Sequence, residues 1–462
     1  MFLYLSVVFI GFLILVYFIR LFSSPFVSLA ENSLALVNTL LLKIDEDEKV
    51  ALVQKQNAKL ILSLFKVVAS ILLAVLVASI PFVIYLILSN KTYQDLDFTS
   101  LASILTLSIG STLGFFIPIK RKNTEGYSEL SKLLHRMALN NYAIAYKLFK
   151  KEAKKLSKKG IKIKPQFVIV SGLARSGTTS LMNRLSENKV FRSLDYSNMP
   201  FLTAPNVWKK FYNPKGNEKK ERSHNDGIMI GLESNEALEE YFLKILENDS
   251  YINENALESY ELTEENYKDY IKYQAVVRNN NESIYLAKNN NFLLRYESIR
   301  KLNADFLIVF MYREPLSHAA SLLEKHKQYS KMQKEDPFVL EYMNWLGHHE
   351  FGLNQKPFQF SDSKMSFNED KLNLDYWLQV WINYYSYLLT IQKENVLFID
   401  YDIYCNEPNQ VLESIYRKLK LKVDGLDFQS FENKREVNSV CSQELQQKAL
   451  KIYKDLKLST TA

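Results

Sequence analysis

A strand–loop–helix segment near the middle of the chain constrains its fold more than any other part. Residues 168–181 read VIVSGLARSGTTSL, where a β-branched run precedes Gly172 and Gly177 and a helix-like sequence follows. Glycines at this spacing let backbone N–H groups at a helix N-terminus surround an anion, so the segment predicts a phosphate-binding loop. Thr178 stands where a loop for ATP or GTP requires lysine, and the loop's own cation is Arg175. The loop therefore predicts a phosphate ligand without the usual triphosphate chemistry.

A second strand–helix segment carries another candidate anion site. The apolar run 306–312 ends at Arg313, and the helix-like sequence after it carries Ser321. An arginine at the carboxyl end of a strand lies where open α/β sheets bind ligands. A guanidinium together with a hydroxyl from the next helix can hold a phosphate. Considered alone, Arg313 would be interpreted as a surface arginine paired with Glu314 or Glu324.

Taken together, the two segments resemble the sulfotransferase family, whose sulfuryl donor is 3′-phosphoadenosine 5′-phosphosulfate (PAPS). The resemblance covers residues 164–421 and implies an α/β fold, in which helices flank a P-loop-like parallel sheet. It implies that Arg313 and Ser321 hold the 3′-phosphate. It also implies that the loop holds the 5′-phosphosulfate through Gly172, Arg175, Ser176, Gly177, Thr178, Thr179 and Ser180.

Four further segments resemble the bacterial and carbohydrate-type branch of this family; they are residues 199–208, 221–227, 286–290 and 398–402. The soluble cytosolic branch differs, because it carries lysine in place of Arg175 and a glycine-rich C-terminal lysine motif that this chain lacks. Lys434 and Arg435 are candidate substitutes for that motif.

Sulfuryl transfer requires charge stabilisation and, for a hydroxyl acceptor, a general base. Arg175 and Lys288 are the cations expected to neutralise charge on the leaving oxygen and the sulfuryl oxygens. A His–carboxylate pair is one way to build the base, and His224 with Asp226 has that composition in a turn-like segment. The rival candidates for the base are Glu233, Glu221 and Asp195, and His224 can equally be an exposed loop histidine.

The other histidines and two tryptophans are expected to be structural. His318 is predicted to pack on the helix after Arg313. His348 and His349 lack carboxylates at metal-ligand spacing, so we predict no metal site. Trp377 and Trp381 are expected in the core, with stacking on an acceptor sugar as the minor alternative.

Three apolar stretches in the first 122 residues predict transmembrane helices at about 2–19, 67–88 and 101–119. Pro81 and the Gly110–Gly114 pair inside the later two predict kinking and close helix packing.

The flanking cations predict the orientation of these spans. Lysine and arginine are concentrated between the first two spans and after the third. By the positive-inside rule, the N-terminus lies outside and everything after residue 119 lies in the cytoplasm. The expected location is a bacterial inner membrane, or a Golgi membrane with a lumenal domain if the chain is eukaryotic.

Two more regions follow the membrane part. Residues 123–164 predict an amphipathic, lysine-rich linker helix, and residues 165–458 predict the sulfotransferase domain, with further strands at 283–287, 306–312 and 396–401. The linker lysines are interpreted as a solvated helix face or as a surface for anionic lipid headgroups. Nucleic acid is not an expected partner, because no basic–aromatic interleaving accompanies them.

The resemblance thus predicts a membrane-anchored enzyme that transfers a sulfuryl group from PAPS to a hydroxyl or amine. The expected acceptors are a glycan, a glycolipid or another amphiphile. Two alternatives remain open: a P-loop kinase or NTPase, and a non-catalytic nucleotide-binding membrane scaffold.

Overall fold

The computed structural model describes residues 2–41, 45–118, 129–212, 220–221, 229–230, 237–360, 370–422, 425–431 and 441–460. The chain forms two compact units, which comprise residues 1–137 and 138–462.

The N-terminal unit is helical. Its helices are α1 (Phe2–Leu21), α2 (Ser24–Leu41), α3 (Glu46–Ser89) and α4 (Leu101–Phe116), followed by α5 (Glu129–Leu139), which continues two residues beyond the unit. Helix α1 packs against α3 and α4, and α2 packs against α3. By length and composition, α1 and α3 could each cross a membrane, whereas α4 is apolar but shorter.

The structure modifies the predicted helix boundaries in this unit. The first two predicted spans lie within α1 and α3, but α3 is one continuous helix of 44 residues that begins well before the apolar stretch. Asp45 caps its N-terminus by accepting a hydrogen bond from the backbone N–H of Asp47, and Pro81 lies inside it. Helix α2 was not predicted. Helix α4 has 16 residues, fewer than the roughly 20 that a perpendicular span requires.

Two glycines of α4 allow close contact with α1, which confirms the predicted close packing. A methyl group at Gly110 would lie 2.5 Å from Phe9 O, and one at Gly114 would lie 2.5 Å from Leu13 O. Arg20 of α1 also donates hydrogen bonds to the carbonyl oxygens of Gly114 and Ile117, each at 2.9 Å. Small residues therefore set the distance between these helices.

Replacing Gly110 by valine should destabilise the N-terminal unit. The branched side chain would collide with the backbone of Phe9, and overpacking of this kind costs about 1–3 kcal/mol. Thermal unfolding of the full chain in detergent should show a lower midpoint. Ile109→Val, one residue away on an exposed position, is the matched control and should leave the midpoint nearly unchanged. Equal midpoints for the two variants would contradict the close packing.

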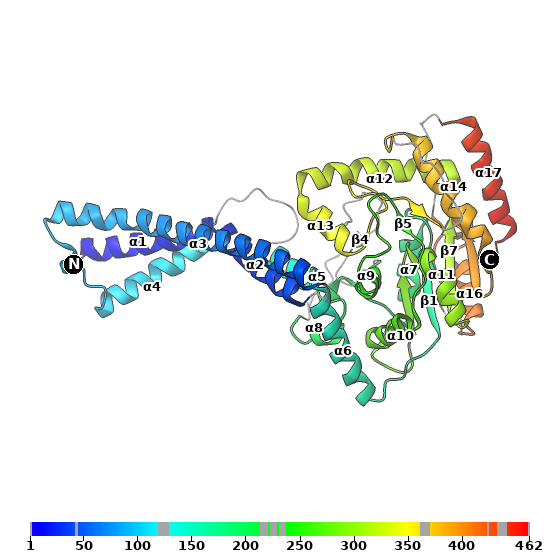
Figure 1. Ribbon diagram of the computed structural model, residues 1–462, viewed down its shortest axis with the longest axis horizontal. Coiled ribbons are helices and arrows are strands. Elements are labelled where there is room, and N and C mark those ends of the chain that lie inside the picture. The colour runs from blue at the N-terminus through cyan, green and yellow to red at the C-terminus, as the bar shows by residue number, and fades with distance from the viewer. Residues whose placement is uncertain are drawn as a thin grey trace. The chain divides into compact units, whose positions relative to one another are not determined.

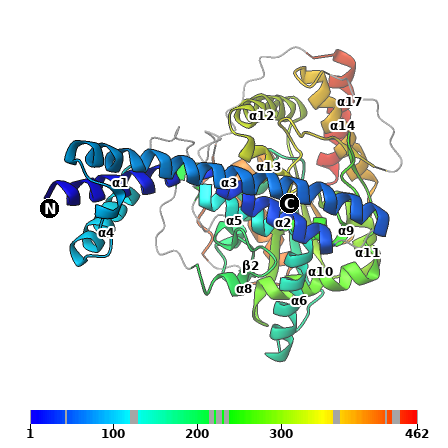
Figure 2. The same cartoon turned by 60° about the vertical axis from the view of Figure 1, so that its left-hand side comes forward.

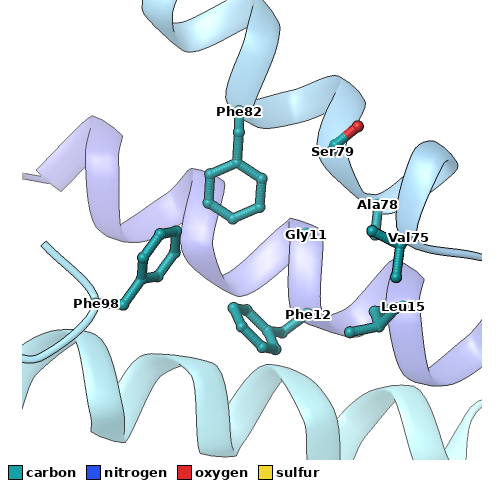
Figure 3. A pocket seen from close by; sticks show the side chains of 8 residues that line it. All are labelled: Gly11, Phe12, Leu15, Val75, Ala78, Ser79, Phe82 and Phe98. Carbon is teal, nitrogen blue, oxygen red and sulfur yellow. The ribbon is translucent and has the colours of Figure 1, made fainter. Parts of the chain in front are cut away.

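The N-terminal unit contains an apolar pocket of about 210 Å³, which Figure 3 shows from close by. Its lining residues come from α1, α3 and the segment before α4; they are Gly11, Phe12, Leu15, Val75, Ala78, Ser79, Phe82 and Phe98. The Ser79 hydroxyl donates to Leu76 O at 2.7 Å, so its hydrogen-bonding capacity is used within its own helix. Such a lining accommodates apolar groups rather than polar ligands.

The C-terminal unit is built on a parallel sheet, as predicted. Its five strands lie in the order β2-β6-β1-β7-β9, and every neighbouring pair is parallel. They are β1 (Phe167–Ser171), β2 (Phe191–Arg192), β6 (Ile284–Lys288), β7 (Leu307–Tyr312) and β9 (Val396–Asp400). Strand β1 is central, and the chain reaches its two neighbours, β6 and β7, in separate crossovers. This strand order places a topological switch point at the carboxyl end of β1, where open sheets bind ligands.

Alternate residues of the strands face two separate apolar layers. Ile169 and Phe310 belong to one layer with helices on one face of the sheet, and Val170 and Val309 belong to the other. Because both faces are covered, β1, β6, β7 and β9 are buried throughout and read as continuous apolar runs. The result is a helix–sheet–helix sandwich (Figures 1 and 2).

The remaining elements connect or cover this sheet. The helices are α6 (Tyr142–Lys158), α7 (Thr178–Ser186), α8 (Pro205–Trp208), α9 (Glu240–Glu247), α10 (Glu264–Arg278), α11 (Tyr296–Leu302), α12 (Pro315–Glu335), α13 (Pro337–Trp345), α14 (Leu374–Thr390), α15 (Tyr401–Asn406), α16 (Pro408–Lys418) and α17 (Gln443–Leu458). The short strands β3 (Lys220–Glu221) and β4 (Met229–Ile230) pair with each other, as do β5 (Leu257–Glu258) and β8 (Phe358–Gln359). Helices α12, α14 and α17 pack together (Figure 1).

The predicted linker helix is two helices. Helix α5 ends at Leu139 and α6 begins at Tyr142, with Asn140 and Asn141 between them. Asparagine competes for backbone hydrogen bonds and favours helix boundaries over helix interiors. The side chain of Phe149 is fully buried, and Lys147, Lys151 and the later lysines of α6 are exposed. The amphipathic character was therefore predicted correctly and the continuity was not.

Candidate functional site

The glycine loop has the backbone geometry of an anion-binding turn. It leaves β1 at Gly172, whose φ is 143° and where a methyl group would lie 2.5 Å from Met311 O. It enters α7 at Gly177, whose φ is 97°. Both positions favour glycine, because side chains rarely adopt such backbone angles. The first backbone N–H groups of α7 thus lie at the carboxyl end of the central strand.

Arg175 connects this loop to the second predicted anion site. Its own φ is 72°, and its Nε donates a hydrogen bond to Ser321 Oγ at 3.3 Å, although the two residues are 146 positions apart. Ser321 is fully buried on α12, and Arg313 at the end of β7 is 4% exposed. The structure therefore brings together the two segments that the sequence predicted to bind phosphate. Arg175 lies with the residues predicted for the 3′-phosphate.

The two guanidinium groups impose an electrostatic cost on each other. Burial lowers the pKa of Arg313, and the positive charge of Arg175 lowers it further, whereas Tyr401 and Asp402 oppose this effect. The Arg313 guanidinium also lies over the Tyr401 ring, 4.9 Å from its centroid. A bound dianion would remove the repulsion between the two arginines, because it would interact favourably with both.

Lys288 brings a cation to the start of α7. It is the last residue of β6, its side chain is 6% exposed, and its Nζ donates to Thr179 Oγ1 at 2.8 Å. An ammonium and a helix N-terminus at one place favour a negatively charged ligand. The structure thus places Lys288 beside the glycine loop, and its role as a sulfuryl-stabilising cation stays a prediction.

Three other residues that were predicted to bind the 5′-phosphosulfate make contacts within the protein or are buried. Ser176 and Thr178 are buried in the turn, at 0% and 3% exposure. The Ser180 hydroxyl forms a 3.1 Å hydrogen bond with the Tyr404 hydroxyl. Tyr404 belongs to the apolar layer around α7, so this contact anchors the helix to α15.

The predicted general base lies outside the part of the chain that is described. His224, Asp226 and Glu233 fall outside the described residues, as do Lys434 and Arg435. Among the rival candidates, Glu221 lies in β3. Asp195 caps a short helical turn by accepting from Ser197 N at 2.9 Å, which gives its carboxylate a structural role.

His318, Trp377 and Trp381 are buried, in agreement with the sequence prediction. His318 Nε2 is 2.7 Å from Ala174 O, so the ring supports the glycine loop from α12. Both tryptophans are fully buried in the core, which excludes the alternative of stacking on an acceptor.

Three polar side chains near Lys288 were not recognised from the sequence as site residues. Glu350 Oε1 accepts a hydrogen bond from Asn290 Nδ2 at 3.1 Å and lies 3.2 Å from His348 Nδ1. Burial alone would raise the pKa of Glu350, but His348 and Lys288 hold it down at about 2. The signals that could have found this group are the His-x-Glu spacing and the position of Asn290 two residues after Lys288.

A buried ionic network holds the end of β6 in place. Asn289 Nδ2 donates to Glu239 Oε1 and Glu240 Oε2, each at 2.9 Å. Arg295 binds Glu240 through two hydrogen bonds of 2.7 Å. Since Asn289 is fixed in this network, its neighbours Lys288 and Asn290 are held by the same short backbone segment.

The neighbouring His349 makes stability depend on pH. Burial lowers its pKa to about 4, and its Nδ1 lies 3.0 Å from Asn354 O. Because the unfolded chain binds this proton at a higher pH than the folded chain does, stability falls as pH drops from about 6.5 to about 4. The slope should be about 1.4 kcal/mol per pH unit for one such proton. Thermal midpoints measured across this range should therefore decrease more steeply for the wild type than for His349→Asn, and equal slopes would contradict the assignment.

Among the residues that the structure describes, no group of three or more His, Cys, Asp or Glu side chains is placed to hold a metal ion. The site is instead defined by Arg175, Arg313 and Lys288 around a helix N-terminus. Such a set can bind a ligand that carries several negative charges and can stabilise charge that develops on its oxygens.

No protein-family model matches the chain, and no curated protein matches it. Among solved structures, the chain is similar to sulfotransferase STF1 from Mycobacterium tuberculosis H37Rv, at 14% identity over 71% of this chain and 82% of that chain, with a TM-score of 0.38. It is similar to sulfotransferase STF9 from Mycobacterium avium, at 13% identity over 70% and 74% of the two chains, with a TM-score of 0.34. It is also similar to a sulfotransferase from Alicyclobacillus acidocaldarius, at 13% identity over 64% and 96%, with a TM-score of 0.32. At these identities and TM-scores, the chemistry of this chain has to be argued from its own residues.

Proposed function

We propose that this chain is a membrane-anchored sulfotransferase that transfers a sulfuryl group from PAPS to a hydroxyl or amine of a glycan, glycolipid or other amphiphile. The hydrogen bond from Arg175 to Ser321 carries the proposal, because it joins two predicted phosphate-binding segments from distant parts of the sequence. A ligand with one phosphate would need only one of the segments. A bisphosphorylated nucleotide would occupy both.

The proposed roles follow from this division. Gly172, Gly177 and the start of α7 would bind the 5′-phosphosulfate together with the Thr178 and Thr179 hydroxyls. Arg313 and Ser321 would bind the 3′-phosphate, with Arg175 shared between the two ends. Lys288 would neutralise charge on the leaving oxygen. His224, Asp226 and Glu233 remain the base candidates from the sequence.

The membrane anchor bears on the acceptor. Helices α1 and α3 are long and apolar enough to span a bilayer, which supports anchoring by length and composition. The lysine and arginine distribution favours a cytoplasmic active domain. An anchored enzyme works next to the bilayer surface, which favours an amphiphilic acceptor over a freely diffusing one.

Nucleotide binding tests the donor assignment. The purified full chain should bind adenosine 3′,5′-bisphosphate much more tightly than ATP, and it should not hydrolyse ATP with Mg²⁺. Magnesium-dependent ATP turnover would replace the proposal with the P-loop NTPase alternative.

Sulfuryl transfer tests the activity. Membranes that contain the chain should be incubated with PAPS radiolabelled in the sulfuryl group and then separated into lipid, polysaccharide and soluble fractions. Label in the lipid or polysaccharide fraction is the expected result. Label confined to a small soluble molecule would exclude the amphiphile, and tight bisphosphate binding without any transfer would favour the non-catalytic scaffold.

A further inference from the structure

A compact polar group lies next to Lys288, on the side formed by the turn after α13. His348 and Glu350 lie in this turn, and Asn290 follows β6. The turn is fixed at two points, because Asn291 Nδ2 donates to Gly347 O and Asn354 Nδ2 donates to His348 O, each at 3.0 Å. The group is therefore held against the end of β6.

The histidine in this group is oriented as a proton acceptor. Its Nδ1 lies 3.2 Å from Glu350 Oε1, and although burial raises the pKa of that carboxyl, the positive charge of Lys288 lowers it. An ionised carboxylate accepts the Nδ1 proton, which leaves the lone pair of the neutral ring on Nε2. The His348 side chain is 19% exposed, so the ring is partly accessible to a substrate that enters from solvent.

Asn290 provides a second feature that points to a ligand. Its side chain is 4% exposed, and its Nδ2 donates to Glu350. Its Oδ1 is buried and has no hydrogen-bond partner among the described residues. A buried carbonyl oxygen without a partner costs free energy, which a hydroxyl donor of a bound substrate would recover.

We propose that His348, oriented by Glu350, is the general base of the transfer, and that Asn290 Oδ1 binds a hydroxyl of the acceptor. This assignment rests on the proposed function, and it names an alcohol as the acceptor class. The acceptor oxygen attacks the sulfur, the bond between sulfur and the phosphate oxygen breaks, and the hydroxyl proton passes to His348 Nε2. The products are the sulfate ester and adenosine 3′,5′-bisphosphate, and the imidazolium then returns its proton to water.

Variants of His348 and His224 separate the two candidate bases. With PAPS as donor and octyl glucoside as acceptor, His348→Ala should lower kcat by about 10²- to 10⁴-fold, the contribution typical of a general base. The affinity for adenosine 3′,5′-bisphosphate should remain within about twofold of wild type, since the ring is outside the donor site. Added imidazole should restore part of the activity of His348→Ala, which a purely structural role would not allow.

Acceptor acidity supplies a second measurement. A nitrophenol ionises readily and needs little help from a base, so His348→Ala should lose much less activity with it than with octyl glucoside. Glu350→Gln should also lower kcat with octyl glucoside while bisphosphate affinity is retained, because the ring loses the carboxylate that orients it.

Three results would overturn the inference. They are full activity of His348→Ala, a parallel loss of bisphosphate binding and activity in that variant, and a loss of kcat in His224→Gln that imidazole rescues. A wild-type chain that transfers nothing to any acceptor would overturn the proposed function itself, and this inference with it. The variant assays therefore test the assignment of the base, and the wild-type assay separately tests the proposed function.

Discussion

Arg313→Met should weaken the binding of adenosine 3′,5′-bisphosphate by about 10- to 100-fold. A hydrogen bond to a charged group is worth about 1.5–3 kcal/mol, and a factor of ten corresponds to about 1.4 kcal/mol. Methionine retains the aliphatic volume of the side chain, so the change removes mainly the guanidinium, together with its contact to the Tyr401 ring. Isothermal titration of the full chain in detergent measures the effect directly.

A shorter ligand and a second arginine make this prediction specific. Adenosine 5′-phosphate lacks the 3′-phosphate, so its affinity should change little in Arg313→Met. The matched control is Arg300→Met, at the opposite end of β7, where the guanidinium is also buried and stacks 3.8 Å from the centroid of the Phe306 ring. That variant should lose stability and retain bisphosphate affinity. If Arg313→Met bound the bisphosphate as tightly as wild type, the 3′-phosphate assignment would be wrong.

The sheet was predictable because its signals are local. A β-branched run that ends at a glycine predicted β1, and similar apolar runs predicted β6, β7 and β9 to within one or two residues. These strands are covered on both faces, so hydrophobicity alone marks them. Helix α2 was missed although Ser24 and Pro25 form a helix-start signal, because its residues are less apolar than those of α1 and its packing against α3 is a tertiary effect.

Candidate site residues could be predicted from the sequence only where a single continuous segment contains the complete binding motif. The glycine loop and the Arg313–Ser321 segment each have an internal spacing that indicates phosphate, and the contact between Arg175 and Ser321 joins them. The group around Glu350 has a His-x-Glu spacing, but that spacing does not indicate a function by itself. Its contact with Asn290 joins residues 60 positions apart, and the sequence gives no sign that they meet. His348 was considered only as a metal ligand, because in the sequence a histidine near a carboxylate has many other roles.

In the proposed function, Lys288 would act in the chemical step, whereas Arg313 would act only in nucleotide binding. In the proposed function Arg313 would contact a phosphate that the reaction leaves unchanged, so its removal should affect donor and product binding alike. Lys288 Nζ lies 2.8 Å from Thr179 Oγ1 at the start of α7. The proposed function places the oxygen that gains charge, as the bond to sulfur breaks, next to this lysine. Interactions that strengthen in the transition state raise kcat, whereas uniform binding does not.

Lys288→Met should therefore lower kcat by about 10²- to 10³-fold, the usual cost of removing one group that stabilises developing charge. The affinity for adenosine 3′,5′-bisphosphate should fall much less, because the product retains the loop and the Arg313 contacts. Lys301→Met is a control of equal charge change; this lysine lies at the far end of α11 in an exposed ion pair with Glu261, and its loss should leave kcat unaltered. Single-turnover transfer from radiolabelled PAPS measures the rate, and titration with the bisphosphate measures binding. Equal losses in rate and binding would make Lys288 a binding residue only, since a cation that acts on the leaving oxygen must favour the transition state over the bound product.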